Sequence, residues 1–144
     1  DQVNNLQELL VKKPDLSASN PLPFLPLFNA QAMFTAQGQY LNFANGSGIR
    51  YLTQFGQAAS PINNQELVYT FQGLTDDGAY YVAAVFPVAQ SELPGDMPSA
   101  DTSFPNGFEA YIQGVNDALA TAVSDSFTPA LDNLDNMVST ITIQ

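Results

Sequence analysis

Two short turn sequences, each set between stretches of alternating residues, constrain the fold of this chain most. Asn45-Gly46-Ser47-Gly48 joins residues 39–45 to 49–57, and Asp76-Asp77-Gly78 separates 67–75 from 80–88. Gly, Asn and Asp adopt the positive φ angles that tight hairpin turns require. Residue alternation is the mark of a strand with two different faces. The sequence therefore predicts a four-stranded antiparallel meander.

The fourth of these stretches differs from the others in having two apolar faces. Its alternate sets are Tyr80, Val82, Ala84 and Phe86 on one side and Tyr81, Ala83 and Val85 on the other. Strands that are apolar on both faces are typical of positions covered from both sides. We expect this strand to lie at the centre of the sheet.

Helical periodicity is strongest at the two ends of the chain. Val3, Leu6 and Leu10 form one stripe, which ends at Lys12-Lys13 before Pro14. Apolar residues at three- and four-residue spacing then run from Phe108 to Val123. A second C-terminal helix is predicted after Thr128 as N-cap, with Pro129 in its first position. The stripe of that helix is Leu131, Leu134, Val138 and Ile141.

These elements predict a single α+β domain over residues 1–144: a four-stranded antiparallel β-meander packed against two C-terminal helices. The segments are an N-terminal helix (1–13), a proline-rich crossover (14–28), the sheet region (29–88), a loop (89–107) and the helices (108–141). The N-terminal helix and the crossover are expected to close an edge or the other face. Residues 30–36 fit a helix capped by Asn29 or a strand, and 140–143 fit a helix or a strand.

Composition excludes several classes of function. The chain has no His and no Cys, so it lacks a Ser-His-Asp triad, a thiol nucleophile, a disulfide and imidazole or thiolate metal ligands. Three basic residues against 14 acidic ones give a net charge of −11, which disfavours nucleic acid and anionic membrane surfaces. No apolar stretch is long enough for a transmembrane helix. No cofactor is expected.

The uncharged polar composition points to an extracytoplasmic protein. Only 12% of residues are charged, and Asn, Gln, Ser and Thr supply most of the polar surface. The opening residues, Asp1-Gln2-Val3, are typical of a mature or trimmed chain. We expect a secreted or surface-anchored protein.

The hairpin sequences carry a resemblance to a known family. The segments 45–55 (NGSGIRYLTQF), 61–64 (PINN) and 69–82 (YTFQGLTDDGAYYV) resemble an uncharacterised family of secreted or lipoprotein-type bacterial domains, over roughly residues 20–140. The family has no assigned activity, so the resemblance implies location alone. In pattern, the meander followed by a helix is also similar to the PsbP-like α/β/α sandwich, which would imply a binding or assembly role.

One basic side chain is a candidate ligand-binding residue. Arg50 is the sole arginine and lies in the middle of a predicted strand. It either forms an ion pair with a structural acid (Glu66 or an acidic helix residue) or binds a ligand carboxylate. Tyr40, Gln54 and Gln72 are expected beside it on the same sheet face. Tyr69 and Tyr81 could stack on a sugar if they are exposed. The speculative binding set is Arg50, Gln54, Tyr69, Gln72 and Tyr81.

Acidic residues offer a weaker candidate. Glu92, Asp96 and Asp101 fall in one proline-rich loop, and oxygen-rich loops can hold Ca²⁺. A solvated acidic loop is the competing interpretation. A carboxylate hydrolase is the least favoured reading, because Glu66 is the only acid expected near a strand.

The sequence thus favours a non-enzymatic, extracytoplasmic interaction or accessory module of a bacterial envelope or secreted protein. Its expected partner is another protein or the rest of a larger parent chain. The alternative is a domain that binds a small carboxylate or sugar on the sheet face around Arg50.

Overall fold

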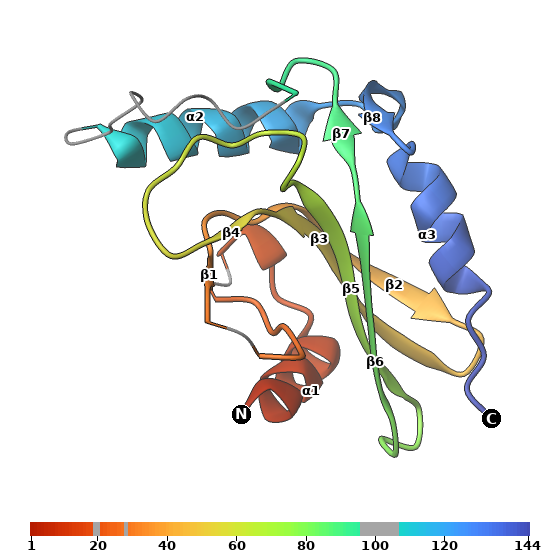
Figure 1. Ribbon diagram of the computed structural model, residues 1–144. Coiled ribbons are helices and arrows are strands. Elements are labelled where there is room, and N and C mark those ends of the chain that lie inside the picture. The colour runs from red at the N-terminus through yellow and green to blue at the C-terminus, as the bar shows by residue number, and fades with distance from the viewer. Residues whose placement is uncertain (19–20, 28, 96–106) are drawn as a thin grey trace.

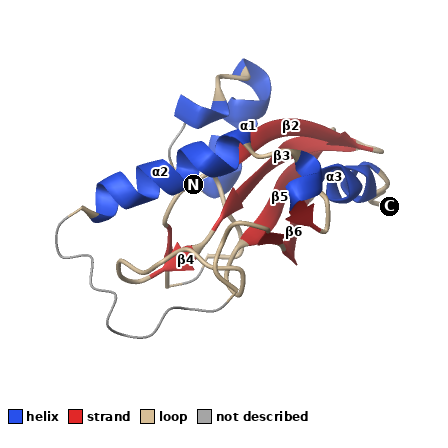
Figure 2. Cartoon of the chain, turned by 90° about the horizontal axis from the view of Figure 1, so that it is seen from above, coloured by secondary structure: helices blue, strands red, loops and turns tan. Residues whose placement is uncertain are grey.

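Both predicted hairpins form, and together they make the main sheet of an α+β fold (Figure 1). The computed structural model describes residues 1–18, 21–27, 29–95 and 107–144. The sheet is antiparallel with strand order β2-β3-β5-β6. Its strands are β2 (Ala36–Phe43), β3 (Gly46–Thr53), β5 (Val68–Thr75) and β6 (Tyr81–Pro87). Figure 2 shows the four strands as one twisted sheet, so the predicted meander is confirmed.

Short strands form two further two-stranded sheets. Strand β1 (Gln31–Ala32) pairs with β4 (Phe55–Gly56), and β7 (Ala89–Gln90) pairs with β8 (Phe127–Thr128). The 3₁₀ turns η1 (Leu16–Ala18) and η2 (Ser124–Ser126) complete the set. Residues 30–36 therefore contain a short strand and no helix, and the predicted strand 49–57 is broken at Gln54. Strand β7 lies inside the predicted loop 89–107, of which 96–106 fall outside the described residues.

Helix α1 (Gln2–Lys12) is bounded by the residues that the sequence suggests. The Asp1 carboxylate accepts a hydrogen bond from the Val3 N–H at 3.0 Å, which satisfies one free amide of the first turn. At the other end Lys13 takes a left-handed conformation with φ 47°, and its N–H donates to the Leu9 carbonyl. Pro14 then prevents continuation of the helix.

The C-terminal helices are α2 (Phe108–Thr121) and α3 (Leu131–Ser139). The predicted start of α3 is wrong, because Thr128 belongs to β8 and the helix begins only after Ala130. Ala130 has no capping side chain, and the Ser124 hydroxyl instead accepts a hydrogen bond from the Asp132 N–H at 2.9 Å. The helix ends at Ser139, so residues 140–143 are neither helix nor strand.

The sheet separates two apolar cores. On one face the strands pack against α2 and α3, as predicted, through residues that include Leu52, Phe71, Leu119, Leu131, Leu134 and Val138. On the other face Ile49, Tyr51 and Leu74 pack against Leu6, Leu9, Leu16 and Leu22 from α1 and the crossover. The expectation that the N-terminal segments cover the other face is therefore confirmed.

Strand β6 lies at the edge of the sheet, and the prediction of a central position is wrong. Strands β3 and β5 are the central pair and are almost wholly buried, whereas the residues of β6 are either half-buried or exposed. Its apolar residues misled the sequence argument because Ala83, Val85 and Pro87 are exposed. Strand β6 is therefore an edge strand whose apolar residues are only partly shielded from solvent.

The glycines of the first hairpin have a different role from the one expected. The turn is formed by Ala44 and Asn45, and Gly46 and Gly48 belong to β3 without a positive φ angle. A Cβ atom on Gly48 would lie 2.3 Å from the Gln72 carbonyl oxygen and 2.6 Å from the Phe71 ring. The second hairpin does use its glycine as predicted, since Gly78 has φ 70°.

Replacement of Gly48 tests this close approach. We expect Gly48→Ala to lower the free energy of unfolding by about 1–3 kcal/mol, because the added methyl group must displace main chain. In the matched control, Gly114→Ala, a Cβ meets nothing within 4 Å in the middle of α2. This control should raise stability by about 0.5–1 kcal/mol. Urea unfolding of both variants measures the difference, and equal stabilities would contradict the packing argument.

Candidate functional site

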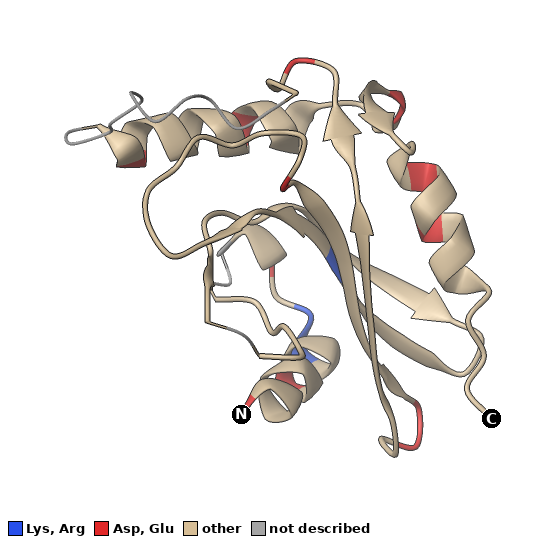
Figure 3. Cartoon of the chain, viewed as in Figure 1, with Lys and Arg blue, Asp and Glu red and all other residues tan. Residues whose placement is uncertain are grey.

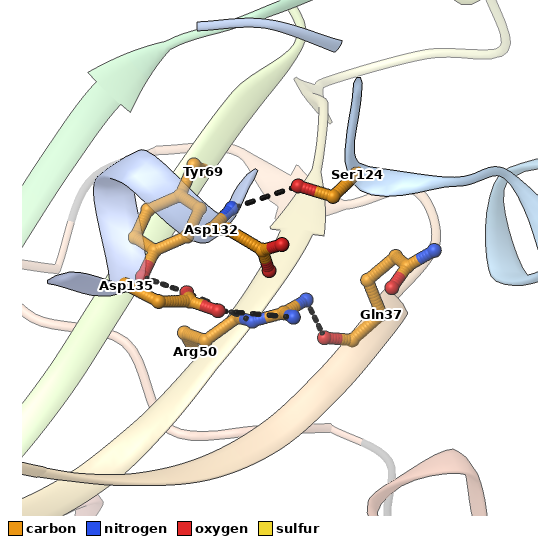
Figure 4. A network of polar contacts seen from close by, with 6 residues as sticks. All are labelled: Gln37, Arg50, Tyr69, Ser124, Asp132 and Asp135. Atoms are coloured by element: carbon orange, nitrogen blue, oxygen red, sulfur yellow. Dashed lines mark hydrogen bonds and ion pairs between the residues drawn. The ribbon is translucent and has the colours of Figure 1, made fainter. Parts of the chain in front are cut away.

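Arg50 forms an ion pair with Asp135 of α3, on the face of the sheet that the C-terminal helices cover. Its Nε lies 3.3 Å from one carboxylate oxygen of Asp135, and Nη2 lies 3.4 Å from the other (Figure 4). The Arg50 side chain is only 3% exposed and that of Asp135 is 17% exposed. A buried charge is costly unless it is paired, so this contact offsets the cost of burying the guanidinium. Of the two roles predicted for Arg50, pairing with an acidic helix residue is the one observed.

A bulge in β2 supplies the second partner of Arg50. The β2–β3 register shifts between Ala36 and Gln39, and Gln37 has a positive φ of 58°. The bulge directs the Gln37 carbonyl to Nη1 of Arg50, as Figure 4 shows. The Gln37 side chain donates to the carbonyls of Leu119 at 2.7 Å and Ala122 at 3.0 Å, at the end of α2. Gln37 thus links the arginine to the end of α2.

Tyr69 completes this polar cluster and is not exposed for stacking. Its hydroxyl donates to the Asp135 carboxylate at 2.7 Å, and the side chain is wholly buried. Burial raises the pKa of Tyr69 far above its ordinary value, and the hydrogen bond to Asp135 acts in the same direction. Arg50, Tyr69 and Asp135 line none of the hollows identified along the described part of the chain.

The sheet register places Gln72, Tyr40 and Tyr81 away from Arg50, which corrects the expectation of a shared face. Gln72 and Tyr40 both pair with Ile49, whose side chain points to the α1 face. The Tyr81 hydroxyl donates to the Gln72 side-chain oxygen at 2.6 Å, and the Leu25 N–H donates to the same oxygen at 2.9 Å. These side chains fasten the proline-rich crossover to the sheet.

Gln54 belongs to a third polar cluster, at the end of β3. Its side-chain nitrogen donates to Glu66 at 3.1 Å, and its oxygen accepts from the Asn63 N–H at 3.0 Å. Asn63 also donates to Glu66, at 3.2 Å. Glu66 therefore stabilises the loop before β5 and is not the partner of Arg50. The five predicted binding residues are divided among three separate structural clusters.

Of the three residues of the predicted Ca²⁺ site, only Glu92 lies in the described part of the chain. This residue follows β7, where its N–H donates to the Gln90 side chain at 2.8 Å. Asp96 and Asp101 lie outside the described residues. Within residues 1–18, 21–27, 29–95 and 107–144, no three acidic side chains are close enough together to hold a metal ion.

The largest hollow that we identify lies between α2 and the turn after β7. It has a volume of about 720 Å³ and is lined by Tyr111, Val115 and Leu119 of α2 together with Glu92 and Leu93. Its volume falls in the range of small-molecule pockets. Its lining is mainly apolar, so it does not resemble a site for a carboxylate or a sugar.

The outer edge of β6 is a different kind of feature, because it carries main-chain groups with no partner. Thr75 donates to the Tyr80 carbonyl and Val88 donates to the Leu67 carbonyl, which fixes the residues that face β5. Main-chain groups alternate in direction along a strand. Tyr81, Ala83, Val85 and Pro87 therefore direct theirs outward. Hydrogen bonds to these outward groups are found nowhere among the described residues.

The same edge is occupied one step further along the chain. Strand β8 pairs with β7 there, and Ser91 donates to the Ser126 carbonyl at 3.2 Å. Because the direction alternates, the main-chain groups of residues 89 and 91 point to the same side as those of Tyr81, Ala83, Val85 and Pro87. Gln90 faces the other way, since its N–H donates to Asn64 at 2.8 Å. The open stretch therefore runs from Tyr81 to Pro87 and stops at β8.

This open stretch has no charge. Between Asp77 and Glu92 the chain contains only uncharged residues. Figure 3 shows β6 and β7 without acidic or basic side chains, while acids mark the hairpin tip, α2 and α3. Val85 is 44% exposed and Tyr80 is 56% exposed. Natural proteins usually protect an edge strand with Lys, a bulge or a covering element.

Comparison with known proteins gives no match to a family model, to a curated protein or to a solved structure. The resemblance to secreted bacterial domains stays a prediction. In the described part of the chain, the helices are too short or too polar to cross a membrane.

Two residues of the central cluster were missed by the sequence analysis. Asp135 is one of several acids on a helix surface, and only its position facing Arg50 distinguishes it. Gln37 acts through a bulge that no local pattern indicates. The free edge of β6 was missed because its apolar faces were read as buried.

Loss of the Asp135 charge should be costly. We expect Asp135→Asn to lower the free energy of unfolding by about 3–5 kcal/mol, because it leaves the Arg50 charge buried without its counter-ion. Asp132→Asn on the same helix is the control, since Asp132 is exposed. Its loss should change stability by less than about 1 kcal/mol. Chemical denaturation measures both, and equal effects would contradict the account of Arg50.

Alkaline pH should destabilise the fold. Burial raises the pKa of Tyr69 and of Tyr51 above the ordinary value of 10.0. The unfolded chain then releases these protons at lower pH than the folded protein does, so stability is present below pH 10 and is lost above it. Thermal unfolding between about pH 9 and about pH 11 should show a falling midpoint. Tyr69→Phe should show a shallower fall, and an identical fall would contradict the argument.

Proposed function

We propose that this protein is a non-enzymatic interaction module that binds an extended polypeptide segment along the outer edge of β6. The observation that carries the proposal is the row of main-chain groups at Tyr81, Ala83 and Val85, which have no partner among the described residues. An extended segment can add to such an edge by main-chain hydrogen bonds, with alternate side chains providing selectivity. The exposed Val85 and Pro87 side chains would contact that segment.

Electrostatics supports an uncharged or basic partner segment. The chain has a net charge of −11, whereas the β6 edge itself is uncharged. An acidic segment would be repelled by the surrounding surface, and a basic one would be attracted. The partner is another protein or the rest of a larger parent chain. The amide-rich composition with few lysines supports an extracytoplasmic setting in a bacterial envelope or secreted protein.

The alternatives have less support. The carboxylate-binding reading depended on Arg50, which is paired with Asp135 and lines no identified hollow. The hollow beside α2 favours, as a second candidate, binding of an apolar small molecule. For a hydrolase, an acid with a raised pKa would be needed. Hydrogen bonds from Ser17 and Thr75 lower the pKa of Asp15 and Asp77, respectively.

Selection of displayed peptides tests the proposal directly. Random ten-residue peptides would be selected on immobilised protein at sub-micromolar concentration. We expect the enriched peptides to be rich in β-branched and aromatic residues, and poor in Pro and acids. They should lose at least about tenfold in affinity for Val85→Lys, which places a charge on the edge.

Val11→Lys is the matched control. Val11 is 83% exposed on α1, away from β6, so this variant adds the same charge and should bind the peptides as the wild type does. Enrichment of no peptide, or equal binding to Val85→Lys, would contradict the proposal. A thermal-shift screen with Ca²⁺, sugars and small carboxylates should be flat, and a clear shift would favour the ligand-binding alternative.

A further inference from the structure

We infer that the β6 edge pairs with the β6 edge of a second copy of this chain, which forms a continuous eight-stranded sheet. The inference rests on the proposed function, because it names a partner for the same edge. Self-pairing of one strand about a two-fold axis is necessarily antiparallel, and the same surface is used on both copies. The geometry of β6 selects one register for this pairing.

That register is centred on Ala83. In an antiparallel pair, two facing residues that both direct their main-chain groups across the seam exchange two hydrogen bonds. Alignment of Ala83 with Ala83 of the second copy also places Tyr81 opposite Val85 of that copy. All three outward N–H groups then find acceptors. A register shifted by one pair would leave the Tyr81 carbonyl opposite Pro87, which has no N–H to donate. It would also move the start of each partner strand one pair further toward the part of the edge that β8 occupies.

Neighbouring elements limit the seam to this stretch and leave it accessible. Strand β8 occupies the edge from Ala89 onward, and Pro87 ends the run of donors. Helix α1 contacts β3 and β5, while α2 and α3 contact β2, at the opposite edge of the sheet. Among the described residues, no main-chain hydrogen bond is made to the outward groups of β6. The small Ala83 side chains at the centre allow close approach of the two strands.

The lack of charge along β6 makes this seam compatible with a second copy of the chain. Two chains of net charge −11 repel each other wherever acidic surfaces meet. Residues 78–91 contain no charged side chain, so this seam places no like charges directly opposite one another. Repulsion between the remaining surfaces still opposes the dimer, and salt screens it. The assembly should therefore strengthen as ionic strength rises, unlike one held by ion pairs.

Sedimentation equilibrium of the full chain tests this inference. From about 5 µM to about 1 mM protein, the weight-average mass should rise toward twice that of the chain. The dimer dissociation constant should fall by at least about threefold between about 0.05 M and about 0.5 M NaCl. Val85→Lys should stay monomeric and folded, since Val85 is partly exposed, whereas Val11→Lys should dimerise as the wild type does.

Amide hydrogen exchange, measured at a low and a high protein concentration, identifies which residues form the dimer seam. The amides of Tyr81, Ala83 and Val85 should become protected at high concentration. A monomer throughout the range, or dimerisation of Val85→Lys equal to that of the wild type, would overturn self-pairing. If the monomer still selects peptides that depend on Val85, the interaction function stands and only the second copy is excluded. If it selects none, both proposals fail.

Discussion

The ion pair between Arg50 and Asp135 is the contact on which the arrangement of the helices depends. A guanidinium in the middle of a central strand cannot be buried without a counter-charge, and α3 supplies it. The same arginine donates a hydrogen bond to the Gln37 carbonyl in the β2 bulge, and the Gln37 side chain donates to the Leu119 carbonyl at the end of α2. One charge in the sheet therefore contacts the bulge and α3 directly, and it is linked to α2 through Gln37.

The use of polar side chains within the fold also explains why we assign partner binding to a sheet edge. The polar side chains that first suggested a ligand site are used within the fold: Tyr69 holds α3, Gln72 and Tyr81 hold the crossover, and Gln54 holds the loop before β5. Both faces of the central strands are covered by helices or by the crossover. The outward main-chain groups of β6 have no partner among the described residues, which is why we assign the interaction to an edge and not to a face.

Local sequence patterns were sufficient to predict the main helices and strands. They were insufficient to predict how these elements are positioned relative to one another. Alternation and turn residues gave the four strands, and apolar periodicity gave the three helices. The position of β6 was predicted wrongly, because its apolar residues suggested burial at the centre of the sheet, although Ala83 and Val85 are exposed at its edge. The start of α3 was misplaced because Thr128 and Pro129 mimic a cap, whereas the capping hydroxyl comes from Ser124. Grouping Gln72 with Arg50 required the β3–β5 register, which is a property of the folded sheet.

Nitrogen NMR of the arginine side chain tests the structural role of Arg50 most directly. Arg50 is the only arginine, so the single Nε–H signal needs no further assignment. The account predicts a signal that exchanges slowly with water at neutral pH, that does not move when acetate is added, and that exchanges rapidly in Asp135→Asn. A signal in the wild type that exchanges as fast as that of free arginine, or that shifts on addition of acetate, would show an accessible guanidinium and contradict the account.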